Sequence, residues 1–298
     1  MGVTIYDIAE RARVSIATVS RVLNGQPRVS ERTRQHVLDI ATQLGYQPHA
    51  SAQSLARQRS HLVAAVLPML TSYFFMEVMR GIHDRLQGSD FDLLVLPSHT
   101  LEDVEGQLER ALQKGLAAGV LLLSTPLSAD WIERLKQSEK PVVLVDAFRP
   151  EFDSVSVDSE RGGYVATRHL LDLGYRRIGL ILGNPESVPS IQRRAGYLRA
   201  LGEARLPQRD ACIVASRDGH NHGYTEQAGY EAMCAILSLT HRPEAVFAAS
   251  DIQAVGALRA IQEAGLSVPD DVALVGFDDI QLSSYIGLST LHQPIYEM

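Results

Sequence analysis

The sequence predicts a small all-α domain at the N-terminus, followed by a larger α/β body with parallel sheets. In the first 46 residues, apolar residues recur at helical spacing behind residues that cap helices. Beyond residue 60, short apolar runs alternate with amphipathic helical segments, which is typical of parallel strands joined by helices. The body is roughly 240 residues long and exceeds a comfortable single core, so we expect two lobes.

Residues 4–45 are expected to form three short helices around one core. Thr4 can cap the first helix with Asp7 in the capping-box position, and Ser15 and Ser30 can cap the next two. The expected core residues recur at helical spacing and are Ile5, Ile8, Ala9, Ala12, Ile16, Val19, Val22, Leu23, Val37, Ile40, Ala41 and Leu44. The tight turn between the first two helices predicts a helix-turn-helix, a motif whose second helix enters the major groove of DNA.

The start of the second helix carries side chains that could reach base edges. Ile16 and Ala17 offer apolar contact, for example to a thymine methyl, whereas the planar fork of Arg21 can pair with guanine O6 and N7. Short polar side chains suited to phosphate oxygens lie near the helix starts and at the second helix's end, and these are Thr4, Ser15, Thr18, Ser20, Asn24 and Ser30. The alternative that these residues only cap helices stays open.

The charges of the two parts differ in sign. Residues 1–60 hold eight Lys and Arg against four Asp and Glu, a net charge of +4, although the whole chain carries −7. Residues 61–298 hold 20 against 31 and carry −11. A basic head suits the phosphate backbone of DNA, and an acidic body discourages nonspecific wrapping of DNA around the rest.

The head, followed by LGYQPHASAQSLARQRS at 44–60, resembles the lactose/galactose/purine repressor (LacI/GalR) family of bacterial transcription regulators. The resemblance continues through SYFFMEVMRGI, SVSVDSERGGYVATRHLLDLGYRRIGLI, RRAGY, FAASDIQAVGALRAI and VPDDVALVGFDDI. It implies a dimeric repressor on a pseudo-palindromic DNA operator, with two periplasmic-binding-protein-like lobes around an effector. The family favours a sugar as effector, and a sugar phosphate or a purine stays open.

Residues 47–60 are expected to link the head to the body. Pro48 prevents the third helix from running on, and the Ala-rich segment ASAQSLAR at 50–57 would be a marginal helix in water because nucleation is costly. By resemblance this is the hinge helix, which orders when two chains meet on the operator. Leu55, with Ala52 beside it, matches the leucine that wedges into the minor groove. An ordinary flexible linker is the alternative.

In the body, seven apolar runs are expected to be buried parallel strands. They lie at 62–69, 92–97, 119–124, 141–147, 177–183, 245–250 and 272–279. The helical segments between them are MEVMRGIHDRL, EGQLERALQK, GGYVATRHLLDLG, RRAGYLRALGEA, EQAGYEAMCAIL and IQAVGALRAIQEAG. The resemblance implies that the chain crosses between lobes near 155–160 and 285–292. The first lobe would then comprise about 61–157 plus 290–298, and the second about 158–289.

Ligands of open α/β sheets bind at the carboxyl ends of the strands, which here means the cleft between the lobes. Phe74 and Phe75 follow the first strand and could stack on a ring, and Asp146 and Asp278 end strands where carboxylates could accept hydrogen bonds. By resemblance, Arg193 matches the arginine of the R-x-x-G-aromatic motif. The full predicted effector set is Phe74, Phe75, Asp146, Arg193, Tyr224, Ser250 and Asp278. Asp251 ends the same strand as Ser250 and is interpreted as the cap of a helix beginning at Ile252, with an effector contact as the alternative.

The sequence departs from the family's pattern in two places. Ser72 and Tyr73 stand where the family often has Asn-Pro, which makes the preferred effector less predictable. The chain stops at Met298, whereas family members continue with a helix and a strand that return to the first lobe. If residue 298 is the end, we expect an exposed sheet edge, weaker folding or altered dimerisation.

Other classes of protein find little support in the sequence. It has no G-x-x-x-x-G-K, G-x-G-x-x-G or G-x-S-x-G motif, so we expect neither an enzyme nor a cofactor. His220 and His222 flank Asn221 and could touch a metal adventitiously, but no metal site is expected. Two cysteines, no signal peptide and no long apolar run favour a cytoplasmic protein without a membrane partner. The alternative is a solute-binding or enzymatic α/β protein with a structural N-terminal helical appendage.

Overall fold

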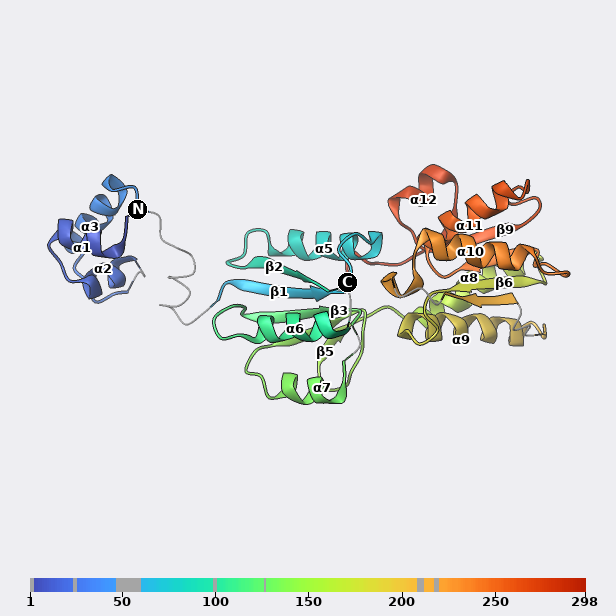
Figure 1. Cartoon of the computed structure of the whole chain (residues 1–298), viewed down its shortest axis with the longest axis horizontal. Coiled ribbons are helices and arrows are strands. Elements are labelled where there is room, and N and C mark those ends of the chain that lie inside the picture. The colour runs from blue at the N-terminus through green and yellow to red at the C-terminus, as the bar shows by residue number, and fades with distance from the viewer. Residues whose placement is uncertain are drawn as a thin grey trace.

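The computed structural model describes residues 3–23, 26–46, 60–98, 101–125, 127–207, 212–216 and 220–298. Figure 1 shows a helical N-terminal domain and two α/β lobes in chain order, with the C-terminus back beside the first lobe. Asn24, Ala52 and Leu55 lie outside the described residues, together with the predicted hinge helix. No helix of the described part is long and apolar enough to cross a lipid bilayer.

The N-terminal domain packs three helices, α1 (Ile5–Ala12), α2 (Ile16–Leu23) and α3 (Glu31–Gln43), around one core. The Asp7 carboxylate accepts hydrogen bonds from both the backbone N and the Oγ1 of Thr4, at 2.7 Å each. Ser15 and Ser30 each accept a bond from the backbone N three residues later, at 3.1 and 3.2 Å. The predicted caps of all three helices therefore form. The buried core consists of Ile8, Ala9, Ala12, Val19, Val22, Val37, Ile40 and Ala41.

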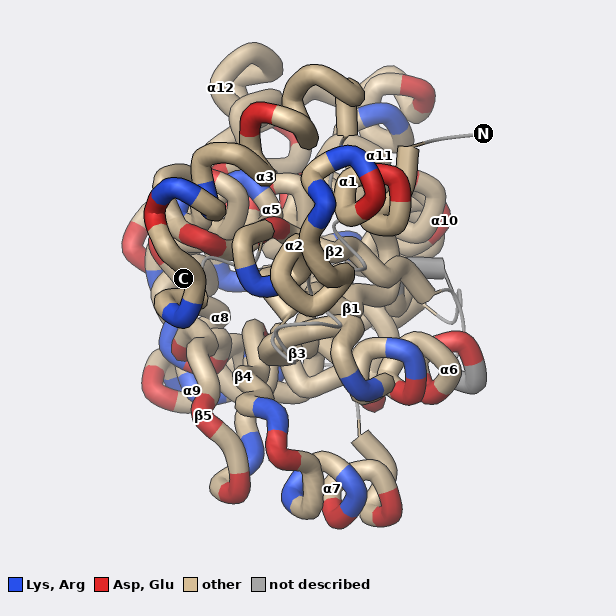
Figure 2. The backbone as a smooth tube through the Cα atoms, turned by 90° about the vertical axis from the view of Figure 1, so that its left-hand side faces the viewer, with Lys and Arg blue, Asp and Glu red and all other residues tan. Residues whose placement is uncertain are grey.

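The first lobe is built on a parallel sheet of order β2-β1-β3-β4-β5. Its strands are β1 (Leu62–Leu67), β2 (Asp92–Pro97), β3 (Gly119–Leu123), β4 (Val142–Val145) and β5 (Asp153–Val155). Helix α5 (Tyr73–Leu86) covers one face, and α6 (Leu101–Leu112) and α7 (Ala129–Lys136) cover the other. Figure 2 shows both signs of charge along α6 and α7, which Arg134 and Glu109 link by an ion pair of 3.2 Å.

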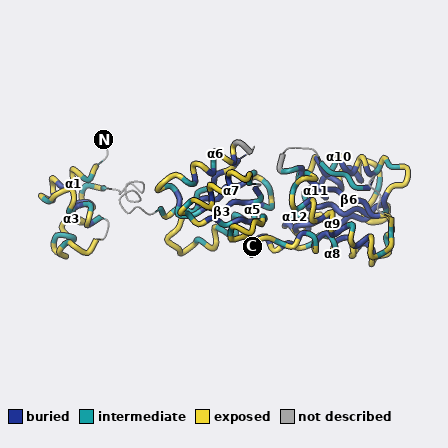
Figure 3. Tube along the Cα trace, turned by 90° about the horizontal axis from the view of Figure 1, so that it is seen from below, coloured by how far each residue is buried: buried dark blue, intermediate teal, exposed yellow. Residues whose placement is uncertain are grey.

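The second lobe holds a parallel sheet of order β10-β9-β8-β6-β7. The strands are β6 (Ile178–Leu182), β7 (Ile213–Ala215), β8 (Ala245–Ala248), β9 (Ala273–Asp278) and β10 (Ser289–His292). Helices α8 (Ser159–Asp172) and α9 (Val188–Glu203) pack on one face, and α10 (Glu226–Leu237) and α11 (Asp251–Glu263) pack on the other. Every residue of β6, β8 and β9 is buried, and Figure 3 shows this interior in dark blue.

The place of the second crossing between the lobes differs from the sequence expectation. Residues 290–292 were expected in the first lobe, but they belong to β10, which pairs with β9 in the second sheet. The chain leaves the second lobe only after His292, and Ile295 is then buried in the core beneath α5. Residues 290–292 stay in the second lobe because β10 adds one more strand to its sheet and Leu291 packs against its core.

Several short elements were not predicted. The strands β5, β7 and β10 lie at the ends of the two sheets, span only three or four residues each and contain no buried residue. Helices α7 and α12 (Gln281–Ile286) span only eight and six residues. Tertiary contacts fix both of them: Trp131 of α7 lies in the first lobe's core, and Ser283 of α12 donates a hydrogen bond to Asp251.

Candidate functional site

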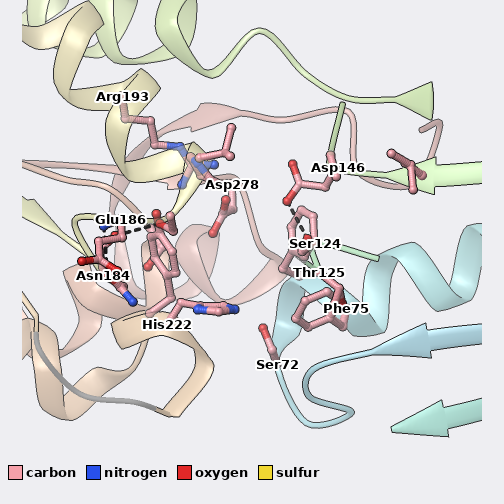
Figure 4. A pocket seen from close by; sticks show the side chains of 18 of the residues that line it. Ser72, Phe75, Ser124, Thr125, Asp146, Asn184, Glu186, Arg193, His222 and Asp278 are labelled. Atoms are coloured by element: carbon pink, nitrogen blue, oxygen red, sulfur yellow. Dashed lines mark hydrogen bonds between the residues drawn. The ribbon is translucent and has the colours of Figure 1, made fainter. Parts of the chain in front are cut away.

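A cavity of about 450 Å³ lies between the two lobes and is lined by residues from both of them. Its lining contains the entire predicted effector set, namely Phe74, Phe75, Asp146, Arg193, Tyr224, Ser250 and Asp278. Figure 4 shows Arg193, Asp278 and His222 on one wall, with Ser72, Phe75 and Asp146 on the wall that faces it. The carboxyl ends of both sheets thus meet at a single site, as expected for open α/β lobes.

The first lobe contributes aromatic rings and one carboxyl group. Helix α5 begins at Tyr73, so Phe74 and Phe75 lie in its first turn, with ring centroids 5.1 Å apart in an edge-to-face arrangement. Asp146 follows β4 with a φ of 54°, and its Oδ2 accepts a hydrogen bond of 2.6 Å from the Ser124 hydroxyl. Burial raises the pKa of Asp146, although Ser124 and the charge of Arg193 counteract this shift.

The second lobe contributes a guanidinium and a second carboxyl group, both almost fully buried. Arg193 of α9 is 5% exposed, and its Cζ lies 3.8 Å from the ring centroid of Phe277. Asp278 ends β9 with a φ of 122° and is 7% exposed. Burial raises the pKa of Asp278 to about 8 despite the nearby charge of Arg193. Below that pH the carboxyl is protonated, so it can donate as well as accept hydrogen bonds.

Tyr224 and Ser250 complete the predicted set on the second-lobe wall. The Tyr224 hydroxyl lies 2.9 Å from Ser190 Oγ, which holds the ring beside the cavity. Ser250 caps α11, since its Oγ accepts a hydrogen bond of 3.2 Å from the backbone N of Gln253.

The expected capping role of Asp251 is therefore wrong, because α11 begins at Asp251 itself and Ser250 is its cap. Asp251 is fully buried and does not line the cavity. Its carboxylate accepts hydrogen bonds from Ile280 N, Ser283 Oγ and Thr290 Oγ1. Asp251 is therefore a structural residue, which links α11 to β10 and to the start of α12.

The surface of α2 carries the predicted base-reading residues. Ile16 is 41% exposed, and Ala17 and Arg21 are exposed as well, although Val19 and Val22 of the same helix are buried. The hydroxyls of Thr4, Ser15 and Ser30 take part in helix caps, as the alternative reading stated. These three residues are nonetheless exposed, so capping and phosphate contact are compatible at each of them. Thr18 and Ser20 are half-buried on the same helix.

Residues 4–49 match the model of the bacterial regulatory proteins of the lacI family, and residues 167–298 match a periplasmic binding protein-like domain. Catabolite control protein A of Priestia megaterium is 34% identical over 303 residues, which cover 100% of this chain and 90% of that protein. The chain belongs to the lacI family.

Solved structures of lacI-family proteins share this fold. The lac repressor dimer bound to operator and the anti-inducer ONPF aligns with a TM-score of 0.83 at 28% identity, covering 100% of this chain and 89% of that one. A complex of the transcriptional regulator CelR with cellobiose aligns with a TM-score of 0.72 at 29% identity, covering 99% and 89%. These relatives are transcription regulators rather than enzymes, in agreement with the motifs of this chain.

The cavity of this lacI-family protein also contains residues that sequence reasoning missed. Ser124 and Thr125 directly follow β3, and Asn184 follows β6 by two residues, so the strand-end rule could have found all three. His222 lies in the short 3₁₀ helix η2 (His220–Gly223), and burial lowers its pKa, which favours the neutral ring. From the sequence, His222 was considered only as an adventitious metal contact. The sequence pattern does not reveal that this turn lines the cavity.

Proposed function

We propose that the protein is a ligand-responsive transcriptional repressor. It binds a pseudo-palindromic operator as a homodimer in the cytoplasm, and a small molecule in the interlobe cavity sets its operator affinity. The observation that carries the proposal is the cavity itself, where a half-buried and a buried carboxyl group, a buried guanidinium and aromatic rings from both lobes converge. It occurs in a chain whose N-terminal domain exposes Ile16, Ala17 and Arg21 on α2.

A sugar is the proposed effector class. Phe74 and Phe75 offer apolar ring surface, and Asp146 and Asp278 can take hydrogen bonds from several hydroxyl groups. Arg193 adds hydrogen-bond donors on the second-lobe wall, beside Asp278. The relative CelR, whose fold is similar, forms a complex with cellobiose. Sugar phosphates and purines are the competing classes, and the experiment below separates them.

For the operator, Arg21 is proposed to pair with a guanine, and Ile16 and Ala17 are proposed to make apolar contacts. The proposed phosphate contacts come from Thr4, Ser15, Thr18, Ser20, Asn24 and Ser30. Ala52 and Leu55 are proposed, from the sequence alone, to enter the minor groove.

Coupling between the two sites follows from the position of the cavity. A ligand that contacts Phe75 and Asp146 on one side and Arg193 and Asp278 on the other stabilises one relative arrangement of the lobes. The first lobe follows the head and the linker in the sequence, so its arrangement in a dimer would set the separation of the two heads. Differential ligand affinity for two arrangements is sufficient for such regulation.

A gel shift with fragments of the source genome and competitor DNA tests the proposal. We expect sequence-specific retention that changes when one probe among D-ribose, cellobiose, glucose 6-phosphate and guanine is added. Arg21→Ala should relax base preference, because it removes the bidentate reader, by about 1–3 kcal/mol at one base pair. Arg11→Ala is the matched control, since Arg11 is an exposed arginine on α1.

The ligand arm uses Arg193→Met, which should retain the DNA complex but lose the response to the active probe. Arg199→Met on the same helix is the control, because that side chain is 46% exposed and pairs with Glu160 at the surface. Absence of specific retention with every probe would favour a solute-binding or enzymatic protein instead. Specific retention that no probe alters would contradict the regulatory role of the cavity.

A further inference from the structure

Gln293 connects the two charged groups of the second-lobe wall from behind. It is 3% exposed and directly follows β10, where the chain leaves the second lobe. Its Oε1 accepts a hydrogen bond of 3.3 Å from Arg193 Nη2, and its Nε2 donates one of 3.3 Å to Asp278 Oδ1. The backbone N of Gln293 also donates to the Asp278 carbonyl, at 3.4 Å. Gln293 itself does not line the cavity.

Within the described residues, Arg193 and Asp278 make no direct ion pair, although both are buried on the same wall. The guanidinium is held elsewhere, because Nη1 donates to the Ala249 carbonyl and the plane stacks on Phe277. Its Nε is buried and has no hydrogen-bond partner. A buried donor without a partner is costly, so an acceptor that reached this nitrogen would be bound favourably.

We propose that Gln293 is a neutral spacer, a positioning residue that satisfies Arg193 and Asp278 separately and so keeps both groups available to the effector. A primary amide has one accepting and one donating end, which match the guanidinium and the carboxyl respectively. Without the amide, Arg193 could reach the carboxyl, favour its charged form and close with it into an ion pair. A closed pair would leave fewer donors and acceptors for a ligand.

The electrostatics of the wall agree with this arrangement. Asp278 is influenced by Arg193, by Asp251 behind the sheet and by Asp146 across the cavity. Burial outweighs Arg193 and raises the pKa of Asp278 to about 8, as expected for a carboxyl that does not pair directly with the arginine.

The test measures the pKa of Asp278 by carbon NMR of the full chain labelled at its aspartate carboxyls, with Asp278→Asn for assignment. In Gln293→Ala the space opens, Arg193 reaches the carboxyl, and the pKa should fall by at least about one unit. In Gln293→Leu the bulk stays and only the amide is lost, so the pKa should rise. A purely structural role predicts a rise in both variants, and that result would overturn the proposal. Gln281→Leu, at an exposed glutamine of α12, should leave the pKa unchanged.

The ligand arm rests on the proposed function and uses D-ribose and cellobiose as probes in thermal shift. Gln293→Ala should reduce at least tenfold the apparent affinity for whichever sugar stabilises the wild type, and Gln281→Leu should not. An unchanged affinity alongside a lowered pKa would overturn the claim that the spacer serves the effector. If neither sugar stabilises the wild type, the proposed effector class fails, and the NMR result still decides the spacer.

Discussion

The two helix pairs of the second lobe, α8–α9 and α10–α11, are built alike although they cover opposite faces of one sheet. Each pair crosses at two glycines, where a Cβ would collide with the backbone of the partner helix. The first glycine of each pair faces a carbonyl of the following helix: Gly163 faces that of Arg193, and Gly229 faces that of Gln253. The second glycine faces the carbonyl of a glutamate in the preceding helix, at Gly196 in one pair and at Gly256 in the other. The close approach of the helices therefore requires glycine at all four positions.

The likeness extends to the outer surface. Tyr164 donates to Glu203 at 2.7 Å while Arg199 lies over its ring, and Tyr230, Glu263 and Arg259 repeat this arrangement with the same 2.7 Å bond. In sequence, E-x-x-G-Y occurs at 160–164 and 226–230, and G-x-L-R-A-x-x-E occurs at 196–203 and 256–263. The second lobe thus contains a two-fold repeat of a helix, a strand and a helix.

The two pairs differ at the residue three positions before the second glycine. In α9 it is Arg193, whose guanidinium lines the cavity. In α11 it is Gln253, which is fully buried and donates a hydrogen bond of 2.9 Å to the Gly223 carbonyl. That bond secures the turn that presents His222 and Tyr224. The same scaffold therefore supplies a charged group to the site in one copy and supports the wall of the site in the other.

The largest expected effect concerns Asp251, the buried charge of the α10–α11 copy. Asp251→Ala leaves three donors of α12 and β10 without an acceptor, so it should lower the free energy of unfolding by about 3–5 kcal/mol. Urea unfolding, monitored by far-ultraviolet circular dichroism, measures this loss of stability. Asp251→Asn keeps the volume and one acceptor and should lose less. Equal losses in Asp251→Ala and the cavity variant Arg193→Met would contradict a division between structural and ligand-binding charges.

An intermediate effect is expected at the glycines that face these two residues. Gly163→Ala and Gly229→Ala each force a methyl group against backbone, so both should cost about 1–3 kcal/mol of stability. Only Gly163→Ala displaces the helix segment that carries Arg193, so it should also weaken the response to the active probe. Thermal unfolding with and without that probe separates the two effects. An equal loss of response in Gly229→Ala would show that Gln253 contributes to the site as much as Arg193 does.

Sequence patterns predicted the parts of this molecule that depend on local interactions. The caps at Thr4, Ser15 and Ser30 join residues three apart, and the buried strands β6, β8 and β9 carry no polar side chain before Asp278 at the end of β9. Residues 290–292 were assigned to the first lobe because the pairing of β10 with β9 depends on tertiary contacts that the sequence pattern does not show. Gln293 was missed for the same reason, since Arg193 lies 100 positions away in the chain.

The cavity residues also divide into those that a local pattern predicts and those that depend on tertiary contacts. Asp146 and Asp278 stand at strand ends, where the rule for open sheets could find them, whereas His222 reaches the cavity through a 3₁₀ helix held by Gln253. No period or motif in the sequence encodes that turn. The role of Asp251 was misjudged because capping is a local pattern, whereas its three donors come from residues 29 to 39 positions away.

The smallest effect is expected at the outer tyrosines. Tyr164→Phe and Tyr230→Phe each remove one hydroxyl that donates to an exposed glutamate, and water can replace that partner. Both variants should keep the Tm within the scatter of repeated scans, and neither should alter the response to the active probe. Differential scanning calorimetry of the two variants side by side checks this expectation. A clear loss of Tm in one variant alone would mean that the two copies are not equivalent at their surface, so that the repeat would extend only to the glycine crossings. Equal and negligible losses would instead place the difference between the copies at Arg193 and Gln253, where a single side chain separates a helix that lines the cavity from one that supports its wall.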